Sequence, residues 1–138
     1  MTTNKAYYFD MDGVLANFHK AYTTNKGTAM NREAMANLEP FTDNVNLVRD
    51  MILKGIKVYI LTAAANEAGK QGKLDWLAKY IPEVTEEAFI CIIGHGKKVD
   101  FIKEEGILVD DDMKNIRPWK KAGFETYFVE TKGEKIEF

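Results

Sequence analysis

The sequence of 138 residues has one cysteine, two histidines and three prolines, and it lacks any long uninterrupted apolar run. Its single cysteine, Cys91, cannot form an internal disulfide bond, which is typical of proteins from a reducing compartment. The apolar runs are too short to cross a bilayer, and no apolar signal segment precedes the first predicted strand. We therefore expect a soluble, cytoplasmic protein without a membrane partner.

The sequence also lacks an excess of positive charge. It has 19 basic and 21 acidic residues, which gives a formal net charge of −2. Proteins that bind nucleic-acid polymers usually carry a basic face. We therefore expect a small molecule as the partner and no nucleic-acid polymer. The length and apolar content fit a single domain over residues 1–138 with a sizeable core.

Short apolar runs alternate along the chain with segments that have helical spacing. The runs predicted to be strands are 7–9, 56–61, 89–93, 107–109 and 126–129. Strands that are apolar on both faces and alternate with helices are typical of a parallel sheet that is covered on both sides. We therefore predict an α/β fold, a Rossmann-like three-layer sandwich with a five-stranded parallel sheet.

Residues 17–42 are predicted to form a minimal helical cap, a small insertion over the end of the first strand. Phe18 and Tyr22 lie one helical turn apart, residues 25–27 close this first helix, and 31–38 form a second one. These pieces are too short and too polar to build a core of their own. The alternative is an ordinary surface excursion.

Polar side chains follow three of the predicted strands. Asp10 and Asp12 come directly after the first strand, Thr62 follows the second, and Asp110 and Asp111 follow the fourth. The carboxyl ends of parallel strands meet at one edge of a sheet, where ligands bind in open α/β folds. Carboxylates in one small volume repel each other unless a cation or a proton intervenes, and Mg²⁺ favours carboxylate oxygens. The pattern therefore predicts a Mg²⁺ site at this edge.

The same edge would hold the groups that phosphoryl transfer requires. One carboxylate can attack phosphorus, and a second can protonate the leaving oxygen and later activate water. The Thr62 hydroxyl, the backbone N–H groups of the turn that begins at Ala63 and a lysine ammonium can hold the phosphate oxygens. Each residue alone would be read as a turn former, a cap or a solvated side chain. Their joint placement at one edge of the sheet favours a catalytic site over these separate structural roles.

The stretch from Asp10 to Leu15, DMDGVL, resembles the first motif of the haloacid dehalogenase-like (HAD) phosphatase superfamily. The order of Thr62, the pair Lys97 and Lys98, and the Asp110-Asp111 step matches its other three motifs. The resemblance covers nearly the whole chain. It implies a phosphoric monoester hydrolase with Mg²⁺ as its cofactor.

By this resemblance Asp10 is the nucleophile, which forms an aspartyl-phosphate, and it is also a ligand of Mg²⁺. Asp12 is the general acid and base, and its backbone carbonyl also binds the metal. Asp110 completes the metal site. We favour Asp110 because it is the first residue after the predicted strand, and Asp111 is the alternative.

The resemblance also implies a phosphate site formed by Thr62, Ala63 and a lysine. We favour Lys98 over Lys97 because the lysine of the family commonly precedes an apolar helical turn. With Asn115 downstream, the chain is most similar to the branch of 5′(3′)-deoxyribonucleotidases and related small nucleotidases.

We therefore expect a Mg²⁺-dependent phosphomonoesterase, with a nucleoside monophosphate as the favoured substrate. Phe18, Tyr22 and Phe41 are candidates to stack on a base. A phosphatase of another small phosphorylated metabolite and a non-catalytic protein that binds phosphate and Mg²⁺ are the alternatives. A receiver-like signalling domain is disfavoured, because its phosphorylated aspartate follows the third strand, where this chain has no carboxylate. The sequence also allows a homodimer in which a second copy of the chain helps the small cap to close the site.

Overall fold

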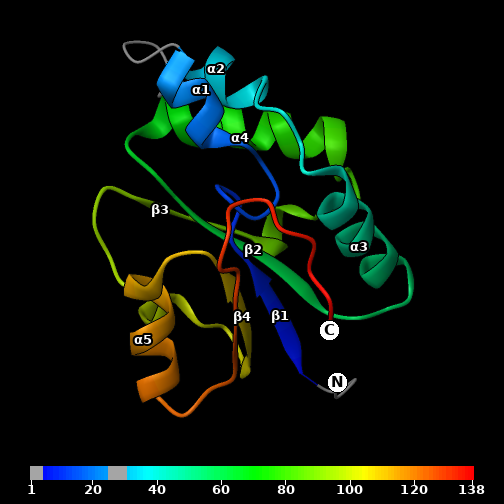
Figure 1. Cartoon of the computed structure of the whole chain (residues 1–138), viewed down its shortest axis with the longest axis vertical. Coiled ribbons are helices and arrows are strands. Elements are labelled where there is room, and N and C mark those ends of the chain that lie inside the picture. The colour runs from blue at the N-terminus through cyan, green and yellow to red at the C-terminus, as the bar shows by residue number, and fades with distance from the viewer. Residues whose placement is uncertain (1–4, 25–30) are drawn as a thin grey trace.

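Within residues 5–24 and 31–138, which the computed structural model describes, five strands form one parallel sheet in the order β3-β2-β1-β4-β5 (Figure 1). The strands are β1 (Ala6–Phe9), β2 (Val58–Ala64), β3 (Phe89–Ile93), β4 (Gly106–Asp110) and β5 (Thr126–Phe128). The predicted α/β fold with a five-stranded parallel sheet is confirmed.

The central strand β1 sets the position of the polar residues that follow the strands. All of its residues are buried, and Phe9 lies opposite Ile60 of β2 and Val109 of β4. Asp10 continues this register, because its backbone N–H donates to the Val109 carbonyl at 2.9 Å. Asp10 and Asp110 therefore arrive side by side at the carboxyl edge of the sheet.

Helices cover both faces of the sheet. The α-helices are α1 (Phe18–Thr24), α2 (Arg32–Ala36), α3 (Thr42–Leu53), α4 (Glu67–Tyr80) and α5 (Met113–Lys121), and the 3₁₀ turns are η1 (Glu86–Ala88) and η2 (Lys98–Phe101). Because side chains alternate along a strand, Tyr7 belongs to one core cluster with Val48 of α3 and Trp76 of α4, whereas Tyr8 belongs to a second cluster and contacts Trp119 of α5. The three layers of the predicted sandwich follow from this alternation.

The segment with α1 and α2 lies over the carboxyl edge of the sheet, where the small cap is predicted (Figure 1). It is anchored on α4. A Cβ added to Gly72 would lie 2.4 Å from the carbonyl oxygen of Arg32, so α2 and α4 are in backbone contact there. The Trp76 indole donates to the Leu38 carbonyl at 2.8 Å. Residues 25–30, which include the predicted end of the first helix, lie outside the described residues.

Two elements differ from their predicted extent. β2 runs on to Ala64, so Thr62 lies within the strand and not after it, because β3 pairs with this part of β2. The sequence predicts a helix that opens at Lys97 and Lys98 and ends at Gly106, but the structure has only the single 3₁₀ turn η2 there. The chain leaves the helical path soon after η2, because the backbone N–H groups of Lys103 and Glu104 donate to the Tyr8 hydroxyl at 3.2 and 2.9 Å.

The last residues, 130–138, fold back across the start of the chain, and we call them the C-terminal strap. The Gly133 N–H donates to the Gly13 carbonyl at 2.8 Å. The Ile136 N–H donates to Oδ1 of Asn44 at 2.9 Å, and the Ile136 side chain is buried. The strap thereby connects the turn after β1 with α3.

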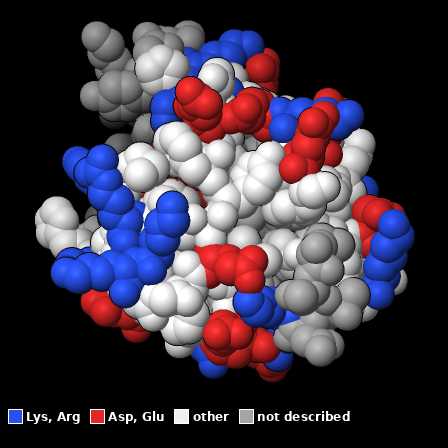
Figure 2. All heavy atoms as spheres, turned by 60° about the horizontal axis from the view of Figure 1, so that its bottom comes forward, with Lys and Arg blue, Asp and Glu red and all other residues white. Residues whose placement is uncertain are grey.

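Basic residues gather on the outer side of α5. These are the exposed residues Lys114, Arg117, Lys120 and Lys121. Figure 2 shows Lys and Arg side chains grouped at the left, over α5, with Asp and Glu side chains at the centre and rim of the same face. Among the described helices, none combines the length and apolar character that crossing a membrane requires.

Replacing Asn44 with alanine is expected to lower the free energy of unfolding by about 2 to 4 kcal/mol. Its buried side chain donates to the Val14 and Glu134 carbonyls, both at 2.9 Å, and accepts from Ile136. Asn46→Ala, at an exposed position of the same helix, is the matched control and should cost at most about 0.5 kcal/mol. Chemical denaturation measures both, and equal losses would contradict this role of Asn44.

Candidate active site

The segment after β1 turns sharply between Met11 and Leu15, whose backbone N–H donates to the Met11 carbonyl at 2.8 Å. Gly13 in this turn has a φ of +86°, a backbone conformation that favours glycine. A Cβ added to Gly13 would lie 2.1 Å from Oδ2 of Asp111. Glycine is therefore required both by the turn and by the approach of Asp111.

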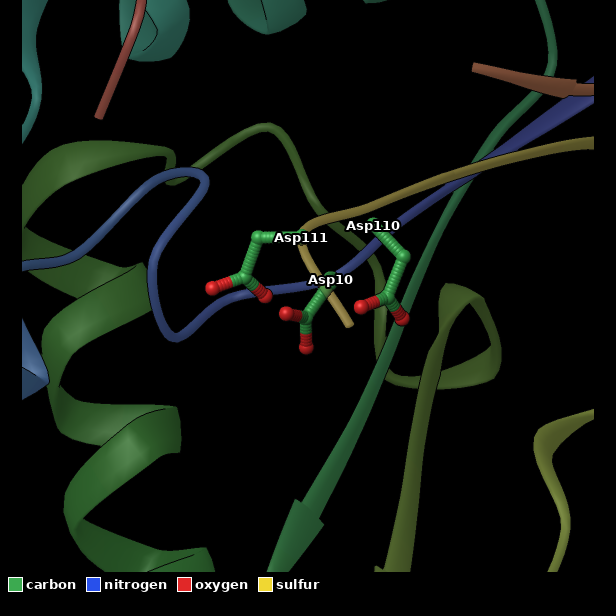
Figure 3. A group of neighbouring side chains, drawn as sticks. All are labelled: Asp10, Asp110 and Asp111. Atoms are coloured by element: carbon green, nitrogen blue, oxygen red, sulfur yellow. The ribbon is translucent and has the colours of Figure 1, made fainter. Parts of the chain in front are cut away.

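Three carboxylates gather where β1 and β4 end. Figure 3 shows the side chains of Asp10, Asp110 and Asp111 directed to the same side of these strands. Each offers an oxygen, and these oxygens lie within 4.8 Å of one another. Asp10 and Asp110 are buried, and Asp111 is half-buried. Hard oxygen donors that are mutually repulsive fit a divalent cation, so this acidic cluster could hold a metal ion.

Lys98 lies between two of these carboxylates. Its ammonium donates to Asp10 Oδ1 at 2.7 Å and to Asp110 Oδ2 at 2.8 Å, and its side chain is 4% exposed. Asp110 has two further donors, the Asp112 backbone N–H at 2.9 Å and the Asn115 amide at 3.2 Å. Asp110 is therefore held more rigidly than its two neighbours.

Burial raises the pKa of the Asp10 carboxyl well above its usual range; Lys98 opposes this shift, and Asp110 and Asp12 add to it. Burial also raises the pKa of Asp110, again against Lys98. For Lys98, burial disfavours the charge, but the attraction of Asp10 and Asp110 outweighs it and raises the pKa. Lys98 therefore keeps its charge, and its ammonium faces the carboxyl groups of both Asp10 and Asp110.

A second buried lysine, Lys73 of α4, holds Asp12 and the end of β2. Its ammonium donates to Asp12 Oδ2 at 2.9 Å, to Thr62 Oγ1 at 2.7 Å and to the Ala63 carbonyl at 2.6 Å. The Lys73 side chain is 2% exposed. The other oxygen of Asp12, Oδ1, is buried and has no hydrogen-bond partner among the described residues. Asp12 thus has one oxygen held by Lys73 and one buried oxygen that has no partner among the described residues.

Lys73 is absent from the residues predicted for the site, because it belongs to none of the four motifs. A signal is nevertheless present in the sequence. Lys73 stands three and four positions before Trp76 and Leu77, which face the core, so helical spacing places it on the buried side of α4. A lysine on such a face is rarely buried unless it is paired.

These groups open into two adjoining spaces. A depression of about 420 Å³ is lined by Asp10, Asp12, Ala63, Lys98, Asp111, Asp112, Asn115 and Lys132. A cavity of about 120 Å³ is lined by Asp12, Phe18, Met35, Ala63, Ala64, Ala65, Gly69 and Lys73. Because Asp12 and Ala63 border both, the cap residues Phe18 and Met35 reach a space directly beside the catalytic candidates. Phe41 lies instead against Gly133 of the C-terminal strap.

Comparison with known proteins identifies the fold. No protein-family model and no curated protein matches the chain. A chain in the structure of the Pnkp1/Rnl/Hen1 complex matches with a TM-score of 0.67 at 18% identity, over 94% of this chain and 47% of that one. The HAD domain of the effector protein Lem4 from Legionella pneumophila matches with a TM-score of 0.55 at 15% identity, over 96% and 88% of the two chains. The chain has a HAD-like fold.

The chain spans about half the length of the matching Pnkp1/Rnl/Hen1 chain but most of the Lem4 HAD domain. At the carboxyl edge of this HAD-like fold lie seven predicted site residues: Asp10, Asp12, Thr62, Ala63, Lys98, Asp110 and Asp111. Lys97, the alternative to Lys98, is exposed and lines neither the depression nor the cavity just described.

Millimolar Mg²⁺ or Mn²⁺ is expected to raise the melting temperature by about 3 to 6 °C, because the ion binds only the folded acidic cluster. Asp110→Asn should lose most of this shift. Asp100→Asn, at an exposed position of η2, is the matched control and should keep it. Thermal unfolding with and without the ion measures the shift, and a shift that Asp110→Asn leaves unchanged would place the ion elsewhere.

Proposed function

We propose that this protein is a Mg²⁺-dependent phosphomonoesterase that acts through an aspartyl-phosphate on Asp10. The observation that carries the proposal is the separate environment of its two aspartates. Asp10 lies in the acidic cluster beside Lys98, whereas Asp12 is held by Lys73 through one oxygen only. These different environments support a nucleophilic role for Asp10 and a proton-transfer role for Asp12. The HAD-like fold supports this assignment.

Asp10, Asp110 and Asp111 would hold Mg²⁺, and the resemblance adds the backbone carbonyl of Asp12. This donor set consists of oxygens, as Mg²⁺ prefers, and its excess negative charge suits a divalent cation. When bound, the ion would neutralise charge on the phosphate group of the substrate.

The reaction would proceed in two displacements. A carboxylate oxygen of Asp10 attacks phosphorus, the bond to the ester oxygen breaks, and Asp12 gives this oxygen a proton. Asp12 then takes a proton from water, whose oxygen attacks the aspartyl-phosphate, so that inorganic phosphate leaves and Asp10 is restored. The Asp12 side chain is 31% exposed and borders both the depression and the cavity, which supports its role in both proton transfers.

Lys73, Lys98, the Thr62 hydroxyl and the backbone N–H groups at the end of β2 would hold the phosphate oxygens. Both lysines are almost completely buried, and their charges act more strongly there than at an exposed surface. Thr62 is oriented by its contact with Lys73. Positioning and charge neutralisation are the main contributions that proteins make to phosphoryl transfer.

A nucleoside monophosphate is the substrate class that we favour, in a deoxyribonucleotidase-like reaction in the cytoplasm. The leaving group would enter the cavity next to Asp12, where Phe18 and Met35 offer apolar contacts. An organic group with a flat apolar face suits such a lining better than a small polar metabolite does.

The proposal is tested by measuring phosphate release, with Mg²⁺, from ribo- and deoxyribonucleoside monophosphates, sugar phosphates and p-nitrophenyl phosphate. Preference for nucleotides is the expected result. Phosphate release from sugar phosphates alone would support a phosphatase of another metabolite. If no ester releases phosphate, the alternative of a non-catalytic protein that binds phosphate and Mg²⁺ is favoured.

Asp10→Asn should reduce turnover by roughly three orders of magnitude or more, because the amide is neither an anionic nucleophile nor a good metal ligand. Steady-state phosphate release measures the loss, and circular dichroism checks that the variant is folded. Activity close to that of the wild type would exclude Asp10 as the nucleophile.

Lys73→Gln should lower kcat/KM by about a hundredfold, the typical effect of removing one preorganised donor from an active site. Lys79→Gln, an exposed lysine of the same helix, is the matched control and should leave kcat/KM unchanged. Melting temperatures of both variants separate a loss of folding from a loss of function. Equal activity of the two variants would remove Lys73 from the phosphate site.

A further inference from the structure

One cation in the depression comes from the C-terminal strap and not from the sheet or its helices. Lys132 lines the depression together with Asp10, Asp12 and Lys98. Its ammonium lies 2.7 Å from Oδ2 of Asp111. The Lys132 side chain is 57% exposed, whereas that of Asp111 is 6% exposed. The contact therefore joins a largely exposed ammonium-bearing side chain to a carboxylate side chain of the acidic cluster that is almost buried.

The backbone that carries Lys132 is held in place on two sides. Within the strap, the Glu134 N–H donates to the Thr131 carbonyl and the Thr131 N–H donates to a Glu134 carboxylate oxygen, both at 2.9 Å. Gly133 has a φ of +78° and donates to the Gly13 carbonyl. The strap is thus bonded to the turn that carries the first motif, directly beside the site.

A side chain at position 133 would disturb this arrangement. A Cβ added to Gly133 would lie 2.3 Å from the ring of Phe41, at the start of α3. The close packing of Phe41 on Gly133 fixes where the strap crosses the turn after β1. The position of the Lys132 backbone is therefore set by the fold, and its side chain extends from there to Asp111.

The charges around Asp111 place Lys132 in competition with a metal. The carboxylates of Asp10, Asp110 and Asp111 face the ammonium groups of Lys98 and Lys132, and Asp112 lines the same depression, so acidic groups outnumber the ammonium groups there. A divalent cation bound to Asp111 would lie close to the Lys132 ammonium if Lys132 kept its contact with Oδ2. Like charges in so small a volume repel each other, so the ion and the ammonium would exclude one another from Asp111.

We propose that Lys132 is a tethered cation that competes with the metal for Asp111 and, once displaced, binds the phosphate group of the substrate. The proposal rests on the proposed function, since it concerns the same site. The strap keeps the released ammonium in the lining of the depression. A phosphate group that binds beside Asp10 would therefore lie within reach of this ammonium. Metal binding and phosphate binding are thereby coupled through one side chain.

Two binding measurements on Lys132→Gln test this coupling. Mg²⁺ alone is titrated against the melting temperature, and inorganic phosphate is then titrated with Mg²⁺ at saturation. The variant should need about fivefold less Mg²⁺ at the midpoint, as expected for the loss of a competing ion pair of this exposure. It should need about fivefold more phosphate, because one charged contact is lost.

Lys135→Gln removes an exposed lysine of the same strap and should reproduce both wild-type midpoints. Lys132→Arg keeps the positive charge and should lie closer to the wild type than Lys132→Gln does. An unchanged Mg²⁺ midpoint in Lys132→Gln overturns the competition, and an unchanged phosphate midpoint overturns the contact with substrate. Absence of any stabilisation of the wild type by Mg²⁺ overturns both parts together.

Neither titration depends on turnover. If no ester is hydrolysed but the two midpoints move in opposite directions, the proposed function fails and the role of Lys132 stands. If esters are hydrolysed and the midpoints of Lys132→Gln equal those of Lys135→Gln, the role of Lys132 fails alone.

Discussion

Lys98 donates to Asp10 and Asp110 at 2.7 and 2.8 Å in a part of the protein that is almost closed to water. Two ionised carboxylates could not stay buried side by side without such a partner, since an unpaired buried charge is very unfavourable. The neighbouring elements are arranged around this interaction. The pairing of β1 with β4 brings the carboxylates together, η2 begins at Lys98, and the start of α5 supplies further donors to Asp110.

Helix α4 connects the cap segment with Asp12 and the end of β2. Gly72 lets α2 approach the helix backbone, the next residue, Lys73, reaches Asp12 and Thr62, and Trp76 one turn later binds the Leu38 carbonyl. A movement of the cap would therefore act on the helix that holds the general acid candidate. The C-terminal strap provides a second link, from the turn after β1 to α3.

Much of this architecture could be predicted because its signals are local. The order of the strands and helices, and the carboxylates at strand ends, follow from apolar runs of strand length that stop at Asp10 and Asp110. The predicted extent of β2 was too short at Thr62, because pairing with β3 and not the residues of β2 decides where that strand ends. Lys73 was missed since motif spacing says nothing about a helix that packs over the strand.

The sequence by itself determined the α/β fold and the chemical type of the groups at the carboxyl edge, because hydrophobic periodicity and strand ends are properties of neighbouring residues. Only the tertiary structure decided which lysine meets which carboxylate. Lys73 and Asp12 are 61 residues apart, and Lys98 and Asp10 are 88 apart. Such contacts depend on the crossing of helices over the sheet and on the return of the strap that brings Lys132 to Asp111, and no local pattern encodes these distances.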